Sequence, residues 1–265
     1  MSQPGDLLVD VVRNLGPVSV AVSGGVDSMT LSVLAHRVAA PNATMVHAVS
    51  PAVPPEATTR VREWAEREGW SLHVLDAGEF DDPDYRRNPV NRCFYCKHSL
   101  YSAIASGFRG TIASGTNCDD LGEYRPGLDA ARRFAVRHPY VEAGIGKSGV
   151  RSLARSLGLG DIAELPASPC LSSRVETAIR IEPATLQVIH QVETLVANAL
   201  RPRTVRCRVR ATGLVIELDR EALERASAGE AELRRLISGA LGPSSRSANL
   251  SFAPYRIGSA FVGAP

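Results

Sequence analysis

The first 116 residues alternate between short apolar runs and longer segments in which apolar residues recur every three or four positions. A run of about 4 to 8 apolar residues between turn residues is typical of a buried strand, and the wider spacing is typical of an amphipathic helix. Strands are therefore expected at 17–22, 43–49, 71–76 and 110–116, and helices at 28–40, 56–70 and 96–108. Strands that alternate with helices form βαβ units, so this part should be a doubly wound α/β domain with a parallel sheet.

The pattern changes after about residue 180. A long helix is expected over 183–200, because a proline suits its first turn and apolar residues form one stripe along it. The stripe consists of Leu186, Ile189, Val192, Val196 and Ala199. Two strand-like runs flank 211–213, and a helix over 221–239 and a strand near 248–252 follow. We therefore expect two domains: the α/β domain over 1–178, and a smaller α+β domain over 179–265 for substrate binding or oligomerisation.

The composition is that of an ordinary globular protein, with 44% apolar and 22% charged residues. A net charge of +2 and the lack of a basic patch interleaved with aromatics weigh against nucleic acid as a partner. No apolar run approaches the ~20 residues of a membrane span, and the N-terminus lacks the basic region of a signal peptide. We expect a cytoplasmic homo-oligomer with no membrane partner. Its five cysteines then indicate metal binding, catalysis or packing rather than disulfides.

The strongest motif is S-G-G-V-D-S, residues 23–28, between the first expected strand and the first expected helix. Open α/β sheets bind ligands at this end of their strands. Two glycines let the backbone approach an anion, and the N-terminus of the helix supplies free N–H groups. A glycine turn with a serine cap is the alternative. Six matching residues in a strand–turn–helix context favour a phosphate-binding loop, although no Gly-Lys-Ser/Thr follows as in a Walker A loop.

This motif resembles the signature of the PP-loop pyrophosphatases, which cleave ATP to AMP and pyrophosphate and activate a substrate oxygen by adenylation. The resemblance implies that Mg²⁺ lies near Asp27. It also implies that the pyrophosphate is bound by Ser23, Gly24, Gly25, Asp27 and Ser28.

Two further motifs carry chemistry-bearing side chains. Cys93 and Cys96 form a C-x-x-C just ahead of an expected helix, a spacing that fits a metal site, an Fe–S site or a redox pair. Two buried thiols without chemistry are the alternative. The second motif, 115–127, follows the fourth expected strand and crowds polar groups into one loop, for which a solvated acidic cap is the alternative. These groups are Asp119, Asp120, Glu123, Tyr124 and Arg125.

Taken in order, the motifs closely resemble the LarE family over about residues 17–260. They are S-G-G-V-D-S, N-R-C-x-x-C-K, G-T-N-x-D-D-x-x-E-Y-R-P-G, P-C-L-S-S-R and R-V-R. That family consists of ATP-dependent pyridinium-3,5-biscarboxylic acid mononucleotide sulfurtransferases, which help to build the nickel-pincer cofactor of lactate racemase. The resemblance implies a PP-loop domain followed by a smaller α+β domain, with Cys170 as the working sulfur.

Two sulfur sources are known in that family. Members with only the P-C-L-x-S-R cysteine sacrifice it, leaving dehydroalanine, whereas members that also carry a C-x-x-C gather three thiolates around a [4Fe–4S] cluster. This chain has Cys93, Cys96 and Cys170, so we favour the cluster over a sacrificial Cys170. The attacking sulfur must be a thiolate, and Arg174 is close enough in sequence to help hold that anion.

The phosphate of the nucleotide substrate needs cations. Arg206, Arg208 and Arg210 alternate along an expected strand and therefore face one side of it. A solvated basic strand is the alternative, but the resemblance places phosphate-binding arginines at Arg208 and Arg210, with Arg256 as a further candidate. Two departures from the family pattern are the lack of a tryptophan in 160–168 and Val215 in place of an expected arginine.

Other functions stay open. Another PP-loop enzyme, such as a tRNA thiolase or an amidotransferase-type synthetase, is one alternative. The charge weighs against RNA, and no cysteine nucleophile follows Met1 as in a fused glutaminase. A non-catalytic nucleotide- or metal-binding protein is the other alternative, although the intact motif at 23–28 and Cys170 count against it.

Overall fold

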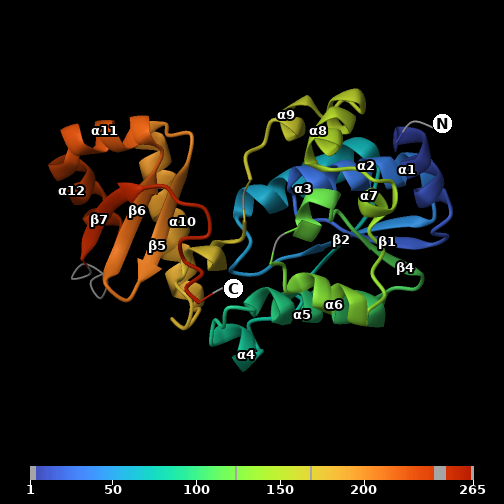
Figure 1. Cartoon of the computed structure of the whole chain (residues 1–265), viewed down its shortest axis with the longest axis horizontal. Helices are drawn as coiled ribbons and strands as arrows, with labels where there is room; N and C mark the ends of the chain where they lie inside the picture. Colours follow the sequence, from blue (N-terminus) through green and yellow to red (C-terminus); the bar gives the residue numbers. More distant parts are fainter. Residues whose placement is uncertain (1–3, 123, 168, 242–248, 264–265) are drawn as a thin grey trace. The chain divides into compact units, whose positions relative to one another are not determined.

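In the computed structural model, which describes residues 4–122, 124–167, 169–241 and 249–263, the apolar run 17–22 forms an interior strand of a parallel sheet. This sheet has four strands in the order β3-β2-β1-β4 (Figure 1). The strands are β1 (Val18–Ala21), β2 (Ala43–Ala48), β3 (Ser71–Leu75) and β4 (Thr111–Ser114). Each lies within a segment where the apolar pattern predicts a strand, and the α/β class with a parallel sheet is confirmed.

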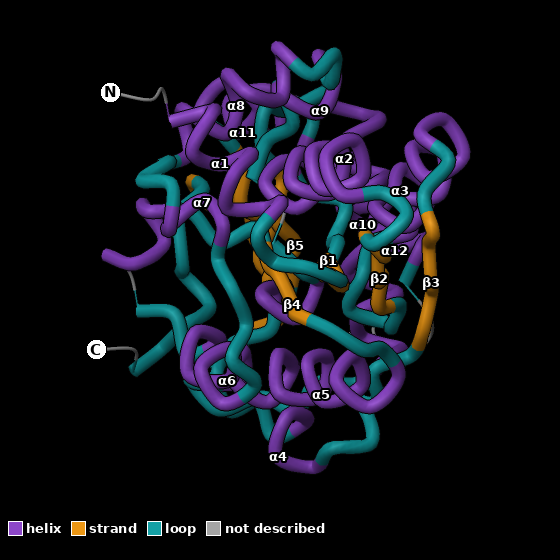
Figure 2. The backbone as a smooth tube through the Cα atoms, turned by 90° about the vertical axis from the view of Figure 1, so that its right-hand side faces the viewer, coloured by secondary structure: helices purple, strands orange, loops and turns teal. Residues whose placement is uncertain are grey.

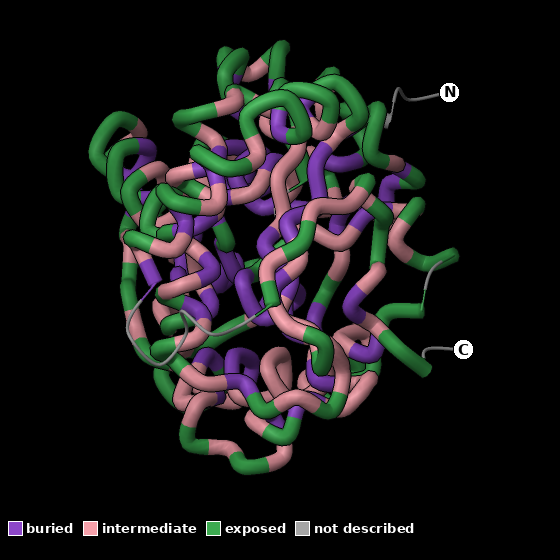
Figure 3. Tube along the Cα trace, turned by 90° about the vertical axis from the view of Figure 1, so that its left-hand side faces the viewer, coloured by how far each residue is buried: buried purple, intermediate pink, exposed green. Residues whose placement is uncertain are grey.

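Helices cover both faces of this sheet (Figure 2). One buried apolar group joins the sheet to α1, α2, α3, α8 and α9, and a second group joins it to α5 and α6. The helices are α1 (Pro4–Arg13), α2 (Val26–Ala39), α3 (Pro55–Glu68), α5 (Arg92–Gly107), α6 (Gly127–Arg133), α7 (Pro139–Glu142), α8 (Lys147–Ser156) and α9 (Gly160–Ala163). Burial varies along the chain, with β1 and residues 28–35 of α2 buried throughout and the other helices partly exposed (Figure 3).

The start of α5 corrects one expectation. The C-x-x-C was placed just ahead of a helix over 96–108, but α5 begins at Arg92, so Cys93 and Cys96 both lie in its first turns. The apolar spacing becomes regular only after Cys96, whereas the backbone turns helical as soon as Asn91 provides the N-cap position. The sequence pattern therefore places the beginning of this helix four residues too late.

A second, smaller sheet follows in the C-terminal part of the chain. Its order is β5-β6-β7, with β5 antiparallel and β7 parallel to β6. The elements of this part are the 3₁₀ turn η2 (Leu171–Arg174), α10 (Pro183–Leu200), β5 (Val205–Arg210), β6 (Gly213–Leu218), α11 (Arg220–Ala228), α12 (Glu230–Ala240) and β7 (Leu250–Pro254). The short helix α4 (Pro83–Arg86) comes earlier in the chain, between β3 and α5. Helices and a mixed sheet confirm the expected α+β character of this part.

Two details of the C-terminal part differ from expectation. The helix expected over 221–239 is two helices, because Gly229 has a non-helical backbone (φ −120°) between α11 and α12. Four members of the α10 stripe, Leu186 to Val196, are fully buried, but Ala199 is exposed because the last turn extends beyond the surface that the stripe covers. None of the described helices is long and apolar enough to cross a membrane.

Contacts divide the chain into two units. The first consists of residues 1–82 and 91–168, and the second of residues 83–90 and 169–265. The division falls earlier in the chain than the domain boundary expected between 178 and 179, and it assigns α4 to the second unit. The extents of the two functional domains stay a prediction.

Candidate functional site

The loops that follow β1 and β4 meet at one edge of the parallel sheet. β1 pairs with β2 on one side and with β4 on the other, and Ala21 lies opposite Ser114 in the register. The chain therefore reverses its direction of winding between these strands, which is where open α/β sheets bind ligands. A Cβ atom on Gly115 would lie 2.8 Å from the backbone of Asp27 and Ser28, so the two loops touch through their main chains.

The first of these loops contains the S-G-G-V-D-S motif and closes on itself through its two serines. The backbone N–H of Ser23 donates to Ser28 Oγ at 3.0 Å, and the Ser28 hydroxyl donates to the carbonyl oxygen of Gly25 at 3.2 Å. α2 begins directly after Gly25, and no described side chain caps it. The first-turn N–H groups of α2 are therefore directed out of the helix end, where an anion would be favoured.

The carboxylate of Asp27 lies between the two loops. Asn117 Nδ2 donates to Asp27 Oδ1 at 3.1 Å, and the Tyr140 hydroxyl donates to the Asp27 carbonyl oxygen at 3.0 Å. Burial raises the pKa of Asp27 and the charge of Asp120 raises it further, while Lys147 acts in the opposite direction. This site thus holds two carboxylates that repel each other, with one ammonium group close by.

Such a pair of carboxylates suits Mg²⁺, which is usually bound by one or two carboxylates together with phosphate oxygens. Within either unit, the described residues contain no group of three or more histidine, cysteine and acidic side chains that could hold a metal by themselves. A site completed by the phosphates of a ligand is therefore the arrangement that fits Asp27 and Asp120.

Sequence reasoning overlooked two residues that the structure brings to Asp27. Asn117 is almost fully buried, and its backbone N–H donates to Asp120 Oδ2 at 3.1 Å. Lys147 begins α8, and its backbone N–H donates to Asp119 Oδ2 at 2.5 Å. A G-I-G-K turn before a helix is the signal that could have identified Lys147, but its distance from the motif in sequence hides the connection.

The polar loop after β4 is partly an ion-paired surface. Asp119 and Asp120 lie in the 3₁₀ turn η1 (Cys118–Gly122), and Arg125 forms an ion pair with Asp120 at 2.7 Å. Tyr124 is half exposed, and Glu123 lies outside the described residues. Of this loop, Asp119 and Asp120 are therefore the groups that the structure connects to the surroundings of Asp27.

The C-x-x-C of α5 presents both thiols on one side of the helix. Cys93 and Cys96 are one turn apart, which places them on the same face, and both are half-buried. Asn91, Phe94 and Tyr95 line a cavity of about 710 Å³, and neither cysteine is among its described lining residues.

Cys170 is exposed and lies immediately before η2, in the second unit. Its expected grouping with Cys93 and Cys96 stays a prediction. The other two cysteines have different surroundings: Cys118 Sγ lies 4.0 Å from the Tyr140 carbonyl oxygen, and burial raises the pKa of the Cys207 thiol far above its usual range.

The hydrogen bonds of Arg174 near Cys170 are to backbone carbonyl oxygens and not to its sulfur. Its guanidinium is 2% exposed and binds both carboxylate oxygens of Glu193, at 3.0 and 3.1 Å. The remaining nitrogen donates to the carbonyl oxygens of Pro169 at 2.5 Å and Cys170 at 3.1 Å. The expectation that Arg174 stabilises the thiolate directly is therefore not met, because its donors are committed to carbonyls and to Glu193.

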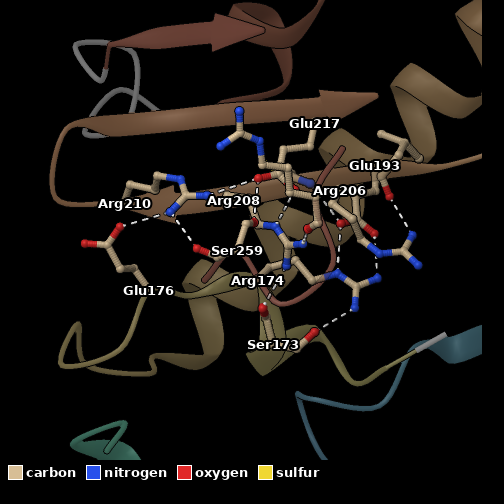
Figure 4. Close-up of polar contacts among 12 residues, drawn as sticks. Ser173, Arg174, Glu176, Glu193, Arg206, Arg208, Arg210, Glu217 and Ser259 are labelled. Atoms are coloured by element: carbon tan, nitrogen blue, oxygen red, sulfur yellow. Dashed lines mark hydrogen bonds and ion pairs between the residues drawn. The ribbon is translucent and has the colours of Figure 1, made fainter. Parts of the chain in front are cut away.

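The arginines of β5 belong to the same buried network (Figure 4). Arg208 is 3% exposed and donates to Glu217 at 2.9 Å and to the Ser173 carbonyl oxygen at 2.9 Å. Arg210 binds Glu217 at 3.0 Å and Glu176 at 3.2 Å. Burial lowers the pKa of Arg206, and the charge of Arg174 lowers it further. The alternating arginines thus share one face, but that face is a network of ion pairs and not a solvated surface.

We expect Asp27→Asn to stabilise the metal-free protein at pH 7. Because the pKa of Asp27 is raised in the fold above its ordinary value of 3.8, the protonated form favours folding. That contribution is complete below the unfolded pKa and is lost as the pH rises through the folded pKa, so at pH 7 the charged carboxylate opposes folding. The melting temperature in a chelator should therefore rise, and the gain should shrink toward acidic pH. Asp10→Asn on the exposed face of α1 is the control, and an unchanged melting temperature at pH 7 contradicts this account.

Glu217→Ala should destabilise the second unit severely. It removes the carboxylate partner of a buried guanidinium, and breaking such a pair costs about 3–5 kcal/mol. Glu221→Ala is the matched control, because its ion pair with Arg203 is 63–79% exposed and should contribute less than about 1 kcal/mol. Urea unfolding, monitored by the hydrogen exchange of the amides in β5 and β6, measures the loss of unfolding free energy in both variants. Equal losses in the two variants would refute the structural role of the Glu217 network.

Comparisons with known proteins place this chain among related sequences. No family model matches it. It is 36% identical over 211 residues to the uncharacterized protein slr1717 of Synechocystis sp., a match that covers 78% of each chain. It is 26% identical over 196 residues to the uncharacterized protein MJ0830 of Methanocaldococcus jannaschii, covering 69% of this chain and 71% of that one.

A third relative has a name that states an activity. The chain is 31% identical over 176 residues to the pyridinium-3,5-bisthiocarboxylic acid mononucleotide synthase of Lactiplantibacillus plantarum, and this match covers 63% of the chain and 62% of that enzyme. The match to slr1717 is the more extensive of the two, and by its identity and coverage the chain belongs to the same protein family as slr1717.

Proposed function

We propose that this protein is an ATP-dependent sulfurtransferase that adenylates a carboxylate of pyridinium-3,5-biscarboxylic acid mononucleotide and converts it to a thiocarboxylate. The observation that carries the proposal is the closed S-G-G-V-D-S turn at the edge of the sheet, which contains Asp27 and has the charge of Asp120 close to that carboxylate. The similarity to a bisthiocarboxylic acid mononucleotide synthase supports an enzymatic role and this class of substrate.

The residues around α2 suit the two products of ATP cleavage. Backbone N–H groups of the turn and the first turn of α2 would bind the pyrophosphate, together with Ser23 and Ser28. Asp27 and Asp120 would hold Mg²⁺, and the Lys147 ammonium lies close enough to Asp27 to affect its pKa. Bound there, Mg²⁺ would supply positive charge for the leaving pyrophosphate.

Adenylation is the step that makes the carboxylate reactive. A carboxylate oxygen attacks the α-phosphorus of ATP, and the bond between that phosphorus and the pyrophosphate oxygen breaks. A sulfur nucleophile then attacks the acyl carbon and expels AMP, which is a far better leaving group than oxide. The loop stabilises the charge that develops on pyrophosphate because its donors are already directed toward that position.

Cys170 is the proposed working cysteine. It is exposed, and Arg174 fixes the carbonyl oxygens on both sides of its Cα, so its thiol is presented on a rigid support. Cys93 and Cys96 share one face of α5, which is the arrangement that two ligands of one cluster require. A [4Fe–4S] cluster held by these three cysteines would supply the transferred sulfide.

The phosphate of the nucleotide substrate would bind to arginines of the second unit. Its buried network combines four guanidinium groups with three carboxylates, and the charges of Arg174 and Arg208 both lower the pKa of Arg206. An anion at Arg206 would relieve this repulsion. Arg210 and the exposed Arg256 are further candidates, whereas Arg208 would act mainly through the network because Glu217 and Ser173 occupy its donors.

Incubation with ATP, Mg²⁺ and the dicarboxylate substrate under anaerobic conditions tests the function. We expect AMP and pyrophosphate in equal amounts and a product heavier by about 16 Da, because sulfur replaces one oxygen. Asp27→Ala should lose pyrophosphate release while keeping the fold, since the carboxylate is not part of the apolar core. Normal pyrophosphate release by that variant would exclude the PP-loop assignment, and pyrophosphate release with no thiocarboxylate would indicate another adenylating enzyme.

The mass of the chain after reaction separates the two sulfur sources. A sacrificial Cys170 forms a thioester and then loses its sulfur by β-elimination, so the chain ends about 34 Da lighter and reacts once. A cluster ligand keeps its sulfur, and added sulfide permits many turnovers. We expect unchanged mass and repeated turnover after reconstitution with iron and sulfide, measured by intact-mass spectrometry. Dehydroalanine at position 170 in one-to-one yield contradicts the cluster, and full activity of Cys170→Ala contradicts both sources.

A further inference from the structure

Residues of α3 hold the S-G-G-V-D-S loop at Gly24. An Arg60 guanidinium nitrogen donates to the Gly24 carbonyl oxygen at 2.8 Å. Gly24 has a φ of +82°, and a Cβ atom on it would lie 2.8 Å from the Ala57 carbonyl oxygen. The loop therefore rests directly on the backbone of α3, and glycine is required at this position both for its conformation and for the space.

The hydrogen bond from Arg60 determines the direction of the next amide. In a planar trans peptide the C=O and the following N–H point in opposite directions. With the Gly24 carbonyl oxygen held toward α3, the N–H of Gly25 points away from α3. Among the described residues, no backbone or side-chain group accepts a hydrogen bond from the N–H of Gly24 or Gly25. These donors are therefore available to an anion in the loop.

A buried histidine ties α3 to the other end of the same segment. His47 lies on β2 with 1% exposure, and its Nδ1 is 2.9 Å from the Val22 carbonyl oxygen, while its Nε2 is 2.9 Å from Thr58 Oγ1. Burial lowers the pKa of His47, so the ring is neutral at pH 7. A carbonyl oxygen can only accept, so Nδ1 carries the proton and Nε2 accepts from the Thr58 hydroxyl. Arg60 thus contacts a loop whose preceding residue, Val22, is already held by His47.

We propose that Arg60 is a positioning residue that keeps the amides of the S-G-G-V-D-S loop directed at a bound pyrophosphate group. This inference rests on the proposed function, because it names the side chain that organises the same anion site. Arg60 acts through the Gly24 carbonyl oxygen, and its positive charge behind the loop favours the anion in addition. The rest of its guanidinium makes no other hydrogen bond with the described residues.

Binding of inorganic pyrophosphate in the presence of Mg²⁺, measured by titration calorimetry, tests this role. Arg60→Ala should weaken binding about tenfold or more, since it removes a charged hydrogen bond that shapes the site. Arg60→Lys keeps a charged donor and should remain within about threefold of the wild type. Arg62→Ala is the matched control, because Arg62 is exposed on the same helix, and it should bind normally.

Hydrogen exchange of residues 22–28 in the ligand-free protein tests the positioning independently of binding. Exchange should accelerate in Arg60→Ala and stay unchanged in Arg62→Ala. Unchanged exchange in Arg60→Ala, or wild-type pyrophosphate affinity in that variant, overturns the inference. If the wild-type chain binds no pyrophosphate while exchange of the loop still accelerates in Arg60→Ala, the proposed function and the anion role of Arg60 are refuted. The hydrogen bond from Arg60 would then be shown only to order the loop.

Discussion

The main-chain contact between the loops after β1 and β4 is the constraint on which the candidate anion site depends. Gly115 packs so closely against Asp27 and Ser28 that no side chain fits between them. This contact exists because β1 and β4 are parallel neighbours in register, with Ala21 opposite Ser114. It brings Asn117 and Asp120 to the carboxylate of Asp27, so the charge of the site is set by the register of two short strands.

The site combines groups that are unfavourable together in the absence of a ligand. Asp27 is buried beside the charge of Asp120, and both effects raise its pKa. The loop leaves amide N–H groups directed outward instead of pairing them within the protein. The repulsion between carboxylates and the unpaired amides call for ligands of opposite charge, because a cation satisfies the carboxylates and a phosphate group satisfies the amides. A magnesium–pyrophosphate pair would satisfy both at once, as the proposed function requires.

The second unit uses buried charge in a different way. Glu193 pairs with Arg174 and Glu217 pairs with Arg208, and the network extends to the carbonyl oxygen of Cys170 through Arg174. A buried ion pair contributes little net stability, because desolvation offsets the attraction, but it tolerates only one geometry. The network is therefore better suited to fixing the loop that carries Cys170 than to strengthening the fold.

The sequence by itself determined the parallel α/β sheet, the later α+β part and the long helix α10, because these follow from local apolar periodicity. It also predicted the turn at 23–28 from a local motif, and through a family resemblance it singled out Cys170, whose role stays a prediction. It placed the start of α5 too late and joined α11 to α12, since a single glycine or cap position decides where a helix begins or ends. Only the tertiary structure revealed that Arg60 and Asn117 donate hydrogen bonds to residues of the loop at 23–28 and that the charge of Lys147 acts on Asp27. It also revealed that Arg208 is paired with Glu217. These partners are far apart in sequence, so no periodicity records them, and they meet only because strand register and helix packing bring their backbones together.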